Sequence, residues 1–194
     1  MKPDQKRMQE ELTGLLNREM SRRNTDLIAD LIRSQERLFD LLFELFLLNL
    51  EPVSRRAAWV VDVVTEQKPE WLEGRIDPLV KALECFQHDG LKRHTLHILA
   101  RSPLPSPDLS GRLVSLCFDW LLAKEEAVST KVYSMEIIAR YVEQEPDLRQ
   151  ELIDSIQWRM EEERAGFRSY AKKLLTRLSR DHTASSKSEF NGKP

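Results

Sequence analysis

Two pairs of potential metal ligands lie near the middle of the sequence. Cys85 and His88 are three residues apart, as are His94 and His97. Thiolate and imidazole are ligands that zinc prefers, and this spacing places both members of a pair on one face of a helix. However, Cys85 falls in the apolar stripe of its segment, and zinc ligands usually lie across a turn and not within helices. We therefore expect no metal site here, with Cys85 in the core and the histidines at the surface or rim.

The remaining chemistry-bearing residues do not form a recognisable catalytic set. Cys117 lies in the apolar segment Leu116–Trp120, without a histidine nearby in sequence to ionise its thiol. The chain also lacks a nucleophile elbow, a glycine-rich phosphate loop and an HExxH pair. We expect Cys117 to be an inert core residue, and we expect no cofactor.

The elements that carry these residues are predicted to be helices. Apolar residues recur with a helical period along most of the chain, and no segment alternates as a strand would. The strongest apolar run, residues 38–50, is 13 residues long and carries Asp40 and Glu44. Because a membrane span needs about 20 apolar residues, this run predicts a buried helix. Further helices are expected at about 5–20 and at 25–33.

A repeat of 37 to 39 residues organises the helices. The turn prolines Pro69, Pro107 and Pro146 are separated by 38 and then 39 residues. Residues 95–101 (TLHILAR) match residues 134–140 (SMEIIAR) at an offset of 39, and the same helix returns about 37 residues later in Ala171–Arg177. The unit is therefore a helix, a proline-containing turn and a second helix, which predicts an α-solenoid.

In these turn prolines and small-apolar first helices the sequence resembles the HEAT-repeat family and, less closely, the armadillo family. The resemblance implies an all-α protein, a right-handed α-α superhelix of helical hairpins. We expect N-terminal helices that form a degenerate first repeat or cap at 1–50. HEAT-like repeats with a terminal capping helix follow at 51–180, and a disordered tail at 181–194. A longer, proline-rich turn at 102–107 departs from the family pattern.

The resemblance also implies that the second helices line a concave binding face. The polar positions projected onto that face are Lys81, Glu84, Arg112, Ser115, Asp119, Gln150, Asp154 and Gln157. A separate basic patch is expected on the last helix, at Arg168, Lys172, Lys173 and Arg177. Because the projected face is mixed to mildly acidic, we expect it to prefer a protein or peptide of basic character.

Charge and composition limit the function. The 194 residues include 30 Lys and Arg against 32 Asp and Glu, and residues 51–150 contain 13 basic and 16 acidic residues. A DNA-binding relative of the HEAT-like alkylpurine DNA glycosylases, the main alternative, would need a positive excess. We therefore expect a non-enzymatic interaction scaffold or adaptor with a protein or peptide partner, and neither nucleic acid nor membrane. With two cysteines and no apolar leader, the chain is expected to be cytoplasmic; a monomer is favoured over a dimer.

Overall fold

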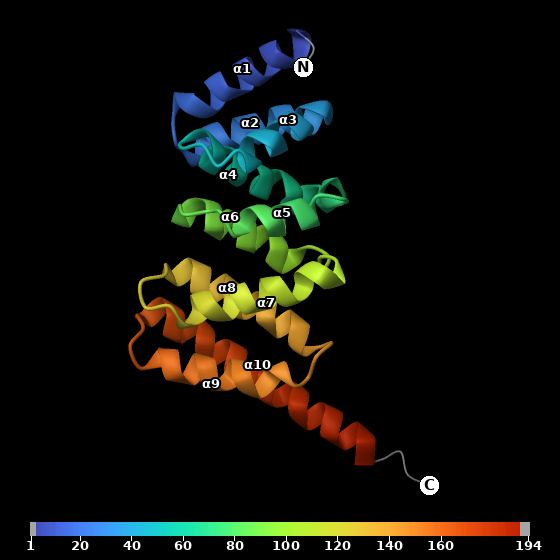
Figure 1. Ribbon diagram of the computed structural model, residues 1–194, viewed down its shortest axis with the longest axis vertical. Coiled ribbons are helices and arrows are strands. Elements are labelled where there is room, and N and C mark those ends of the chain that lie inside the picture. Colours follow the sequence, from blue (N-terminus) through green and yellow to red (C-terminus); the bar gives the residue numbers. More distant parts are fainter. Residues whose placement is uncertain (1–2, 191–194) are drawn as a thin grey trace. The chain divides into compact units, whose positions relative to one another are not determined.

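The computed structural model describes residues 3–190, with side chains for residues 4–180. Every regular element in this part of the chain is helical, which confirms the all-α prediction (Figure 1). In chain order the elements are α1 (Pro3–Arg18), α2 (Arg22–Ser34), α3 (Arg37–Leu47), α4 (Val53–Gln67), the short 3₁₀ helix η1 (Pro69–Leu72), α5 (Ile76–Leu83), α6 (Asp89–Arg101), α7 (Pro107–Leu122), α8 (Val128–Val142), α9 (Leu148–Met160) and α10 (Ala165–Phe190).

The chain divides into two compact units, with the boundary between Ser110 and Gly111 in the first turn of α7. In the first unit α4 lies at the centre and packs against α1, α2, α3 and α6. The small side chains Ala57 and Ala58 are fully buried, and this allows neighbouring helices to approach α4 closely. Burial on nearly all sides explains why the middle of α4, Ala57–Val64, is apolar except for Asp62.

Helix α3 contains most of the apolar run at residues 38–50, and the predicted buried helix is confirmed. Seven of its eleven residues are buried, and no helix among residues 3–190 is long and apolar enough to span a membrane. Asp40 pairs with Arg75, whose guanidinium lies 5.3 Å from the Phe39 ring centroid. The helix ends at Leu47 rather than at residue 50, because Asn49 adopts a left-handed conformation (φ 55°) that terminates a helix.

The structure also places the start of α2 before residue 25, the start expected from the sequence. The helix begins at Arg22, because the Ser21 hydroxyl accepts a hydrogen bond from the Asn24 backbone N–H at 3.1 Å. Asn24 lies inside α2, where its side chain donates to the Leu15 and Glu19 carbonyls. Serine and asparagine both favour the first position of a helix. Only the three-dimensional contacts show that Ser21 caps α2 and that Asn24 does not.

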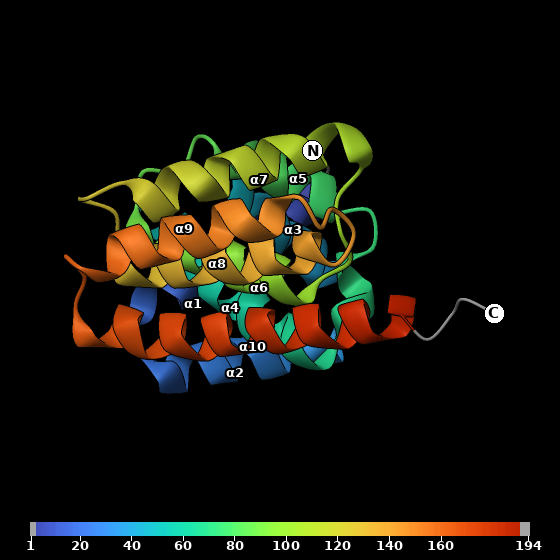
Figure 2. The ribbon, with the colours of Figure 1, turned by 90° about the horizontal axis from the view of Figure 1, so that it is seen from below.

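In the second unit α8, α9 and α10 pack against one another (Figure 2). Phe167 and Ala171, from the first two turns of α10, are fully buried. Helix α10 continues to Phe190 and so includes residues 181–190, which were predicted to form a disordered tail. This stretch contains no glycine or proline to end a helix. Residues 191–194 of the predicted tail lie outside the described residues.

The predicted repeat is visible within each unit. Helices α4 and α5 are joined through η1 and a short turn, in which Gly74 has a φ of +70° that favours glycine. The first helices of successive hairpins contact each other directly, as α4 and α6 in the first unit and α8 and α10 in the second. Contact between equivalent helices buries apolar faces that a lone hairpin would leave exposed.

Candidate functional site

A buried carboxylate, Asp62 of α4, faces α6 and is the centre of a polar cluster in the first unit. Its neighbours in the sequence are valines, and its side chain is only 8% exposed. A carboxylate in such surroundings needs partners for its charge. The partners come from the facing surface of α6, at three positions spaced three and four residues apart: His94, His97 and Arg101.

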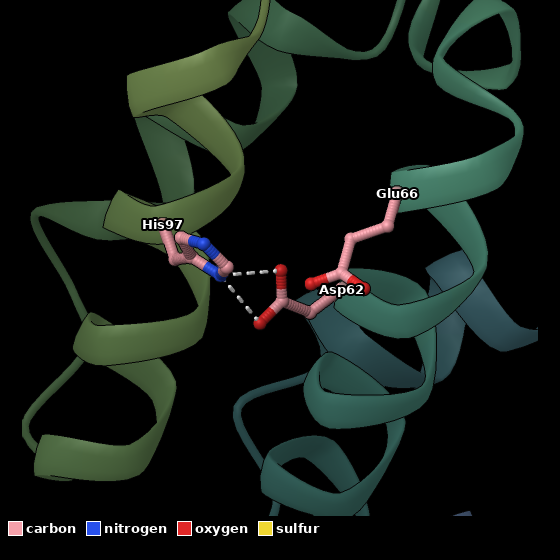
Figure 3. A group of neighbouring side chains, drawn as sticks. All are labelled: Asp62, Glu66 and His97. Carbon is pink, nitrogen blue, oxygen red and sulfur yellow. Dashed lines mark hydrogen bonds and ion pairs between the residues drawn. The ribbon is translucent and has the colours of Figure 1, made fainter. Parts of the chain in front are cut away.

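Each of the two histidines contacts the Asp62 carboxylate through its Nδ1 atom. His94 Nδ1 lies 2.8 Å from Oδ2 of Asp62, and His97 Nδ1 lies 3.0 Å from both carboxylate oxygens (Figure 3). Because an ionised carboxylate only accepts hydrogen bonds, we assign the proton in both rings to Nδ1. The His94 ring also stacks on Trp59 with 6.0 Å between centroids. Arg101 Nη1 lies 2.8 Å from Oδ1, and Nη2 donates to the backbone carbonyl of Asp62.

These contacts determine the protonation states within the cluster. Burial alone would raise the pKa of Asp62, but hydrogen bonds from His94 and His97 and the charge of Arg101 outweigh it and lower that pKa well below its usual range. Burial lowers the pKa of His94, although its bond to Asp62 acts in the opposite direction. The cluster at neutral pH therefore contains an ionised Asp62 beside a neutral His94, and it joins α4 to α6.

A second buried ionic cluster lies in the other unit. Glu163 is 7% exposed and accepts from Lys131 of α8 and, at 2.8 Å, from Arg159 of α9. Burial would raise the pKa of Glu163, but hydrogen bonds from these two cations outweigh it and lower the pKa. Lys131 Nζ also donates to the Lys124 carbonyl at 3.1 Å. The cluster fixes the segment between α9 and α10 against the start of α8.

The four residues of the Cys/His hypothesis do not converge. Cys85 is exposed and not in the core, because the chain has already left α5 at that point. His88 Nδ1 accepts a hydrogen bond from the Gly90 N–H at 2.9 Å and so caps α6. His94 is buried rather than at the surface, and only His97 belongs to a group of possible metal ligands among the described residues. The expected core position is confirmed for Cys117, which is fully buried.

The residues projected onto a binding face are all exposed. In the first unit Lys81 lies in α5 and Glu84 directly follows it. In the second unit three of them lie on α7 and three on α9: Arg112, Ser115, Asp119, Gln150, Asp154 and Gln157. Gln150 donates to Asp154 at 2.8 Å. Their role in binding stays a prediction.

The predicted basic patch lies on α10, where all four cations are exposed. Arg177 Nη1 lies 3.3 Å from Glu136 of α8, which neutralises one of the four charges. Arg168, Lys172 and Lys173 are the other members. The patch is therefore less positive than the sequence of α10 alone indicates.

Sequence reasoning missed both buried ionic clusters. The available signal was a charged residue beside apolar residues within a predicted helix: Asp62 between Val61 and Val63, and Lys131 before Val132 and Tyr133. A charge at such a position is buried only if another element supplies a partner. The partners are 32 residues away along the chain, for both Asp62–His94 and Lys131–Glu163.

Stacked antiparallel hairpins, equivalent helices in contact and a 37 to 39 residue period define a helical repeat protein. Residues 12–178 match the model of the HEAT repeat domain family. The match covers most of the chain, and the chain belongs to that family. No curated protein and no solved structure matches the sequence.

Proposed function

We propose that this HEAT repeat protein is a protein-interaction module, a scaffold or adaptor that binds short segments of basic character. The observation that carries the proposal is an acidic groove in the first unit. It has a volume of about 540 Å³, within the range of ordinary ligand sites. The groove is lined by Pro69, Glu70, Leu72, Glu73, Gly74, Ile76, Asp77, Pro103 and Leu104.

The lining combines apolar surface with three carboxylates. Among the described residues that line the groove, Glu70, Glu73 and Asp77 are the ionisable ones. The backbone N–H of Ser106 donates to Asp77 Oδ1 at 2.9 Å, and this bond lowers the pKa of Asp77, so the group is charged at neutral pH. Among the described side chains Glu70 pairs with Lys68, at 3.7 Å between exposed groups, and such pairs contribute little. The groove therefore suits a lysine or arginine flanked by proline or aliphatic residues.

A second surface that fits a protein partner lies on α9 of the other unit. Trp158 is 60% exposed, and Asp154 lies one turn before it on the same face. Exposed tryptophans are frequent anchors of protein interfaces. This surface includes predicted binding residues, whereas the basic patch on α10 is partly neutralised by Glu136. We therefore favour a protein partner over nucleic acid.

The test is to select binders from a random 12-residue peptide display library on immobilised protein. Selected peptides should be enriched in Lys or Arg beside Pro or Leu. The double variant Glu70→Lys/Glu73→Lys should weaken their binding at least about tenfold, measured by fluorescence anisotropy, because two attractive charges become repulsive. Asp77 is left unchanged because it holds Ser106.

The matched control is Glu44→Lys, which reverses an exposed charge on α3 away from the groove. It should leave peptide affinity unchanged. Selection of peptides without basic residues, or equal binding to the double variant and the parent, would refute the groove as the binding site. Loss of binding only in Asp154→Lys would assign the partner to α9 instead.

A further inference from the structure

We propose that Asp62, Glu66 and His97 form a binding site for a divalent first-row transition ion such as Zn²⁺. The three donors come from two facing helices: the carboxylates from successive turns of α4 and the imidazole from α6 (Figure 3). One ligand atom from each residue lies within 4.8 Å of the other two. A tetrahedral zinc ion with bonds of about 2.1 Å needs ligand atoms about 3.4 Å apart, so small side-chain movements suffice.

The Asp62 carboxylate has an acceptor position directed into this group. Oδ1 is a buried oxygen that accepts no hydrogen bond among the described residues. The 2.8 Å approach of Arg101 Nη1 is an ion pair without hydrogen-bond geometry, and His97 Nδ1 lies 3.0 Å away while its hydrogen bond goes to Oδ2. A carboxylate oxygen left in this way is an available metal ligand.

Metal binding replaces a proton in this arrangement. His97 now shares one Nδ1 proton with the carboxylate, at equal distances to the two oxygens. When that proton moves to Nε2, Nδ1 offers its lone pair to the ion, and the lone pair of Asp62 that His97 occupied becomes available to the same ion. His94 keeps its own bond to Oδ2 and orients the carboxylate, as groups behind metal ligands commonly do.

Charge and access favour the same location. Glu66 lies near Asp62, and Arg22 of α2 interacts electrostatically with both carboxylates, without an ion pair to Glu66 among the described side chains. Arg101 contacts the Asp62 carboxylate, and a bound divalent ion would add positive charge in direct contact with both carboxylates. Glu66 is exposed and the His97 side chain is 33% exposed, so the ion can enter from solvent. The imidazole nitrogen favours Zn²⁺ and related ions over Mg²⁺ and Ca²⁺.

The site would connect α4 and α6 in addition to the bonds already present. It uses residues outside the proposed peptide groove and does not depend on that function. Bound Zn²⁺ should therefore raise the melting temperature of the full chain, because the ion binds the folded arrangement and not the unfolded one.

The experiment is a calorimetric titration of the untagged full chain with ZnCl₂ at neutral pH. We expect one ion per chain, and at least about tenfold weaker binding in Glu66→Gln and in His97→Asn. Glu66→Gln is the informative variant because Glu66 is exposed and its loss leaves the Asp62 contacts intact; circular dichroism checks the fold. MgCl₂ should give no binding in the same range.

Two control variants separate this site from other possible ligands. Glu44→Gln removes an exposed carboxylate elsewhere, and Cys85→Ser removes the exposed thiol; both should bind Zn²⁺ as the parent does. The proposal is overturned by absence of Zn²⁺ binding at about 100 µM, by unchanged affinity in Glu66→Gln, or by loss of binding in Cys85→Ser. Equal affinity for Mg²⁺ would also overturn the choice of ion.

Discussion

Ser21 and Asn24 are neighbouring polar residues with different functions at the junction of α1 and α2. The Ser21 hydroxyl accepts the Asn24 N–H at the start of α2, while the Asn24 amide donates to carbonyls at the end of α1. Both sets of groups lack partners within their own helices. The short connection between the helices is therefore held by side chains at a point where backbone hydrogen bonding stops.

Replacing Ser21 with alanine should reduce the free energy of unfolding by about 1 kcal/mol, because the Asn24 N–H loses its acceptor. Urea unfolding followed by circular dichroism measures the change. Ser179→Ala is the control, since Ser179 lies on the exposed surface of α10 and its hydroxyl donates to the Leu175 carbonyl within the same helix. A decrease of the same size in both variants would show that Ser21 does not act as a cap.

The two cysteines should differ sharply in reactivity. Cys117 is fully buried, and burial raises the pKa of its thiol to about 12, so the thiolate that reacts is nearly absent at pH 8. Cys85 is exposed. Iodoacetamide at pH 8 should label one cysteine of the native protein, identified as Cys85 by mass spectrometry, and Cys85→Ser should remain unlabelled until it is denatured. Native labelling of Cys117 would contradict the burial.

At the scale of elements, the buried cluster around Glu163 connects α8 and α9 to the segment before α10. Glu163→Gln removes the shared carboxylate from two buried cations, and we expect a loss of about 3–5 kcal/mol. Lys131→Met should cost less, because Glu163 keeps its bond to Arg159 at 2.8 Å. Chemical denaturation of both variants tests the order. Glu161→Gln is the matched control, since that side chain lies nearby and is exposed.

The same carboxylate predicts a pH dependence. The pKa of Glu163 is lower in the folded protein than its ordinary value of 4.5, so the unfolded chain binds more protons near that pH. Its stabilisation is fully present above about pH 5 and decreases as the pH falls below 4.5, with a slope of at most about 1.4 kcal/mol per pH unit. Glu163→Gln should lack this component in denaturation curves at pH 3–6. If Glu163→Gln leaves the slope of unfolding free energy against pH unchanged, other carboxylates are responsible for the pH dependence.

The helices could be predicted from the sequence much better than the contacts between them. The turn prolines and the apolar period predict α4 to α10 because both are local signals. Predicting the end of α3 would have required knowing the left-handed conformation of Asn49. Predicting the start of α2 would have required knowing that the Asn24 side chain contacts α1, which leaves Ser21 as the capping residue. These depend on neighbouring elements that a local pattern does not contain.

The candidate site could not be predicted for a related reason. His94 and His97 were recognised as a ligand pair from their spacing, but their partner was sought at Cys85, which is nearby in the sequence. In a repeat protein the nearest element in space is the equivalent helix of the adjacent repeat, about 35 residues away. Asp62 lies 32 residues before His94 and faces it across that distance. Searching for partners of the histidines at positions about one repeat away in the sequence would have located Asp62.

For the whole molecule, the division into two units predicts that stability is local. Helical repeats contact mainly their neighbours, so the stability of the chain is close to a sum of repeat and interface contributions. A destabilising substitution should then affect its own unit most. Ser54 in the first unit and Glu163 in the second are both buried, so one substitution in each unit can test whether its effect stays within that unit.

The last prediction compares Ser54→Ala with Glu163→Gln by native-state hydrogen exchange. The Ser54 hydroxyl donates to the Leu45 carbonyl and accepts the Leu50 N–H, so its loss should speed exchange in α3 and α4. Glu163→Gln should speed exchange in α8 to α10 instead, because its partners lie there. Each unit thus serves as the control for the other. If either variant accelerates exchange equally in both sets of helices, the chain unfolds as one cooperative body, since only complete unfolding would then expose the protected amides.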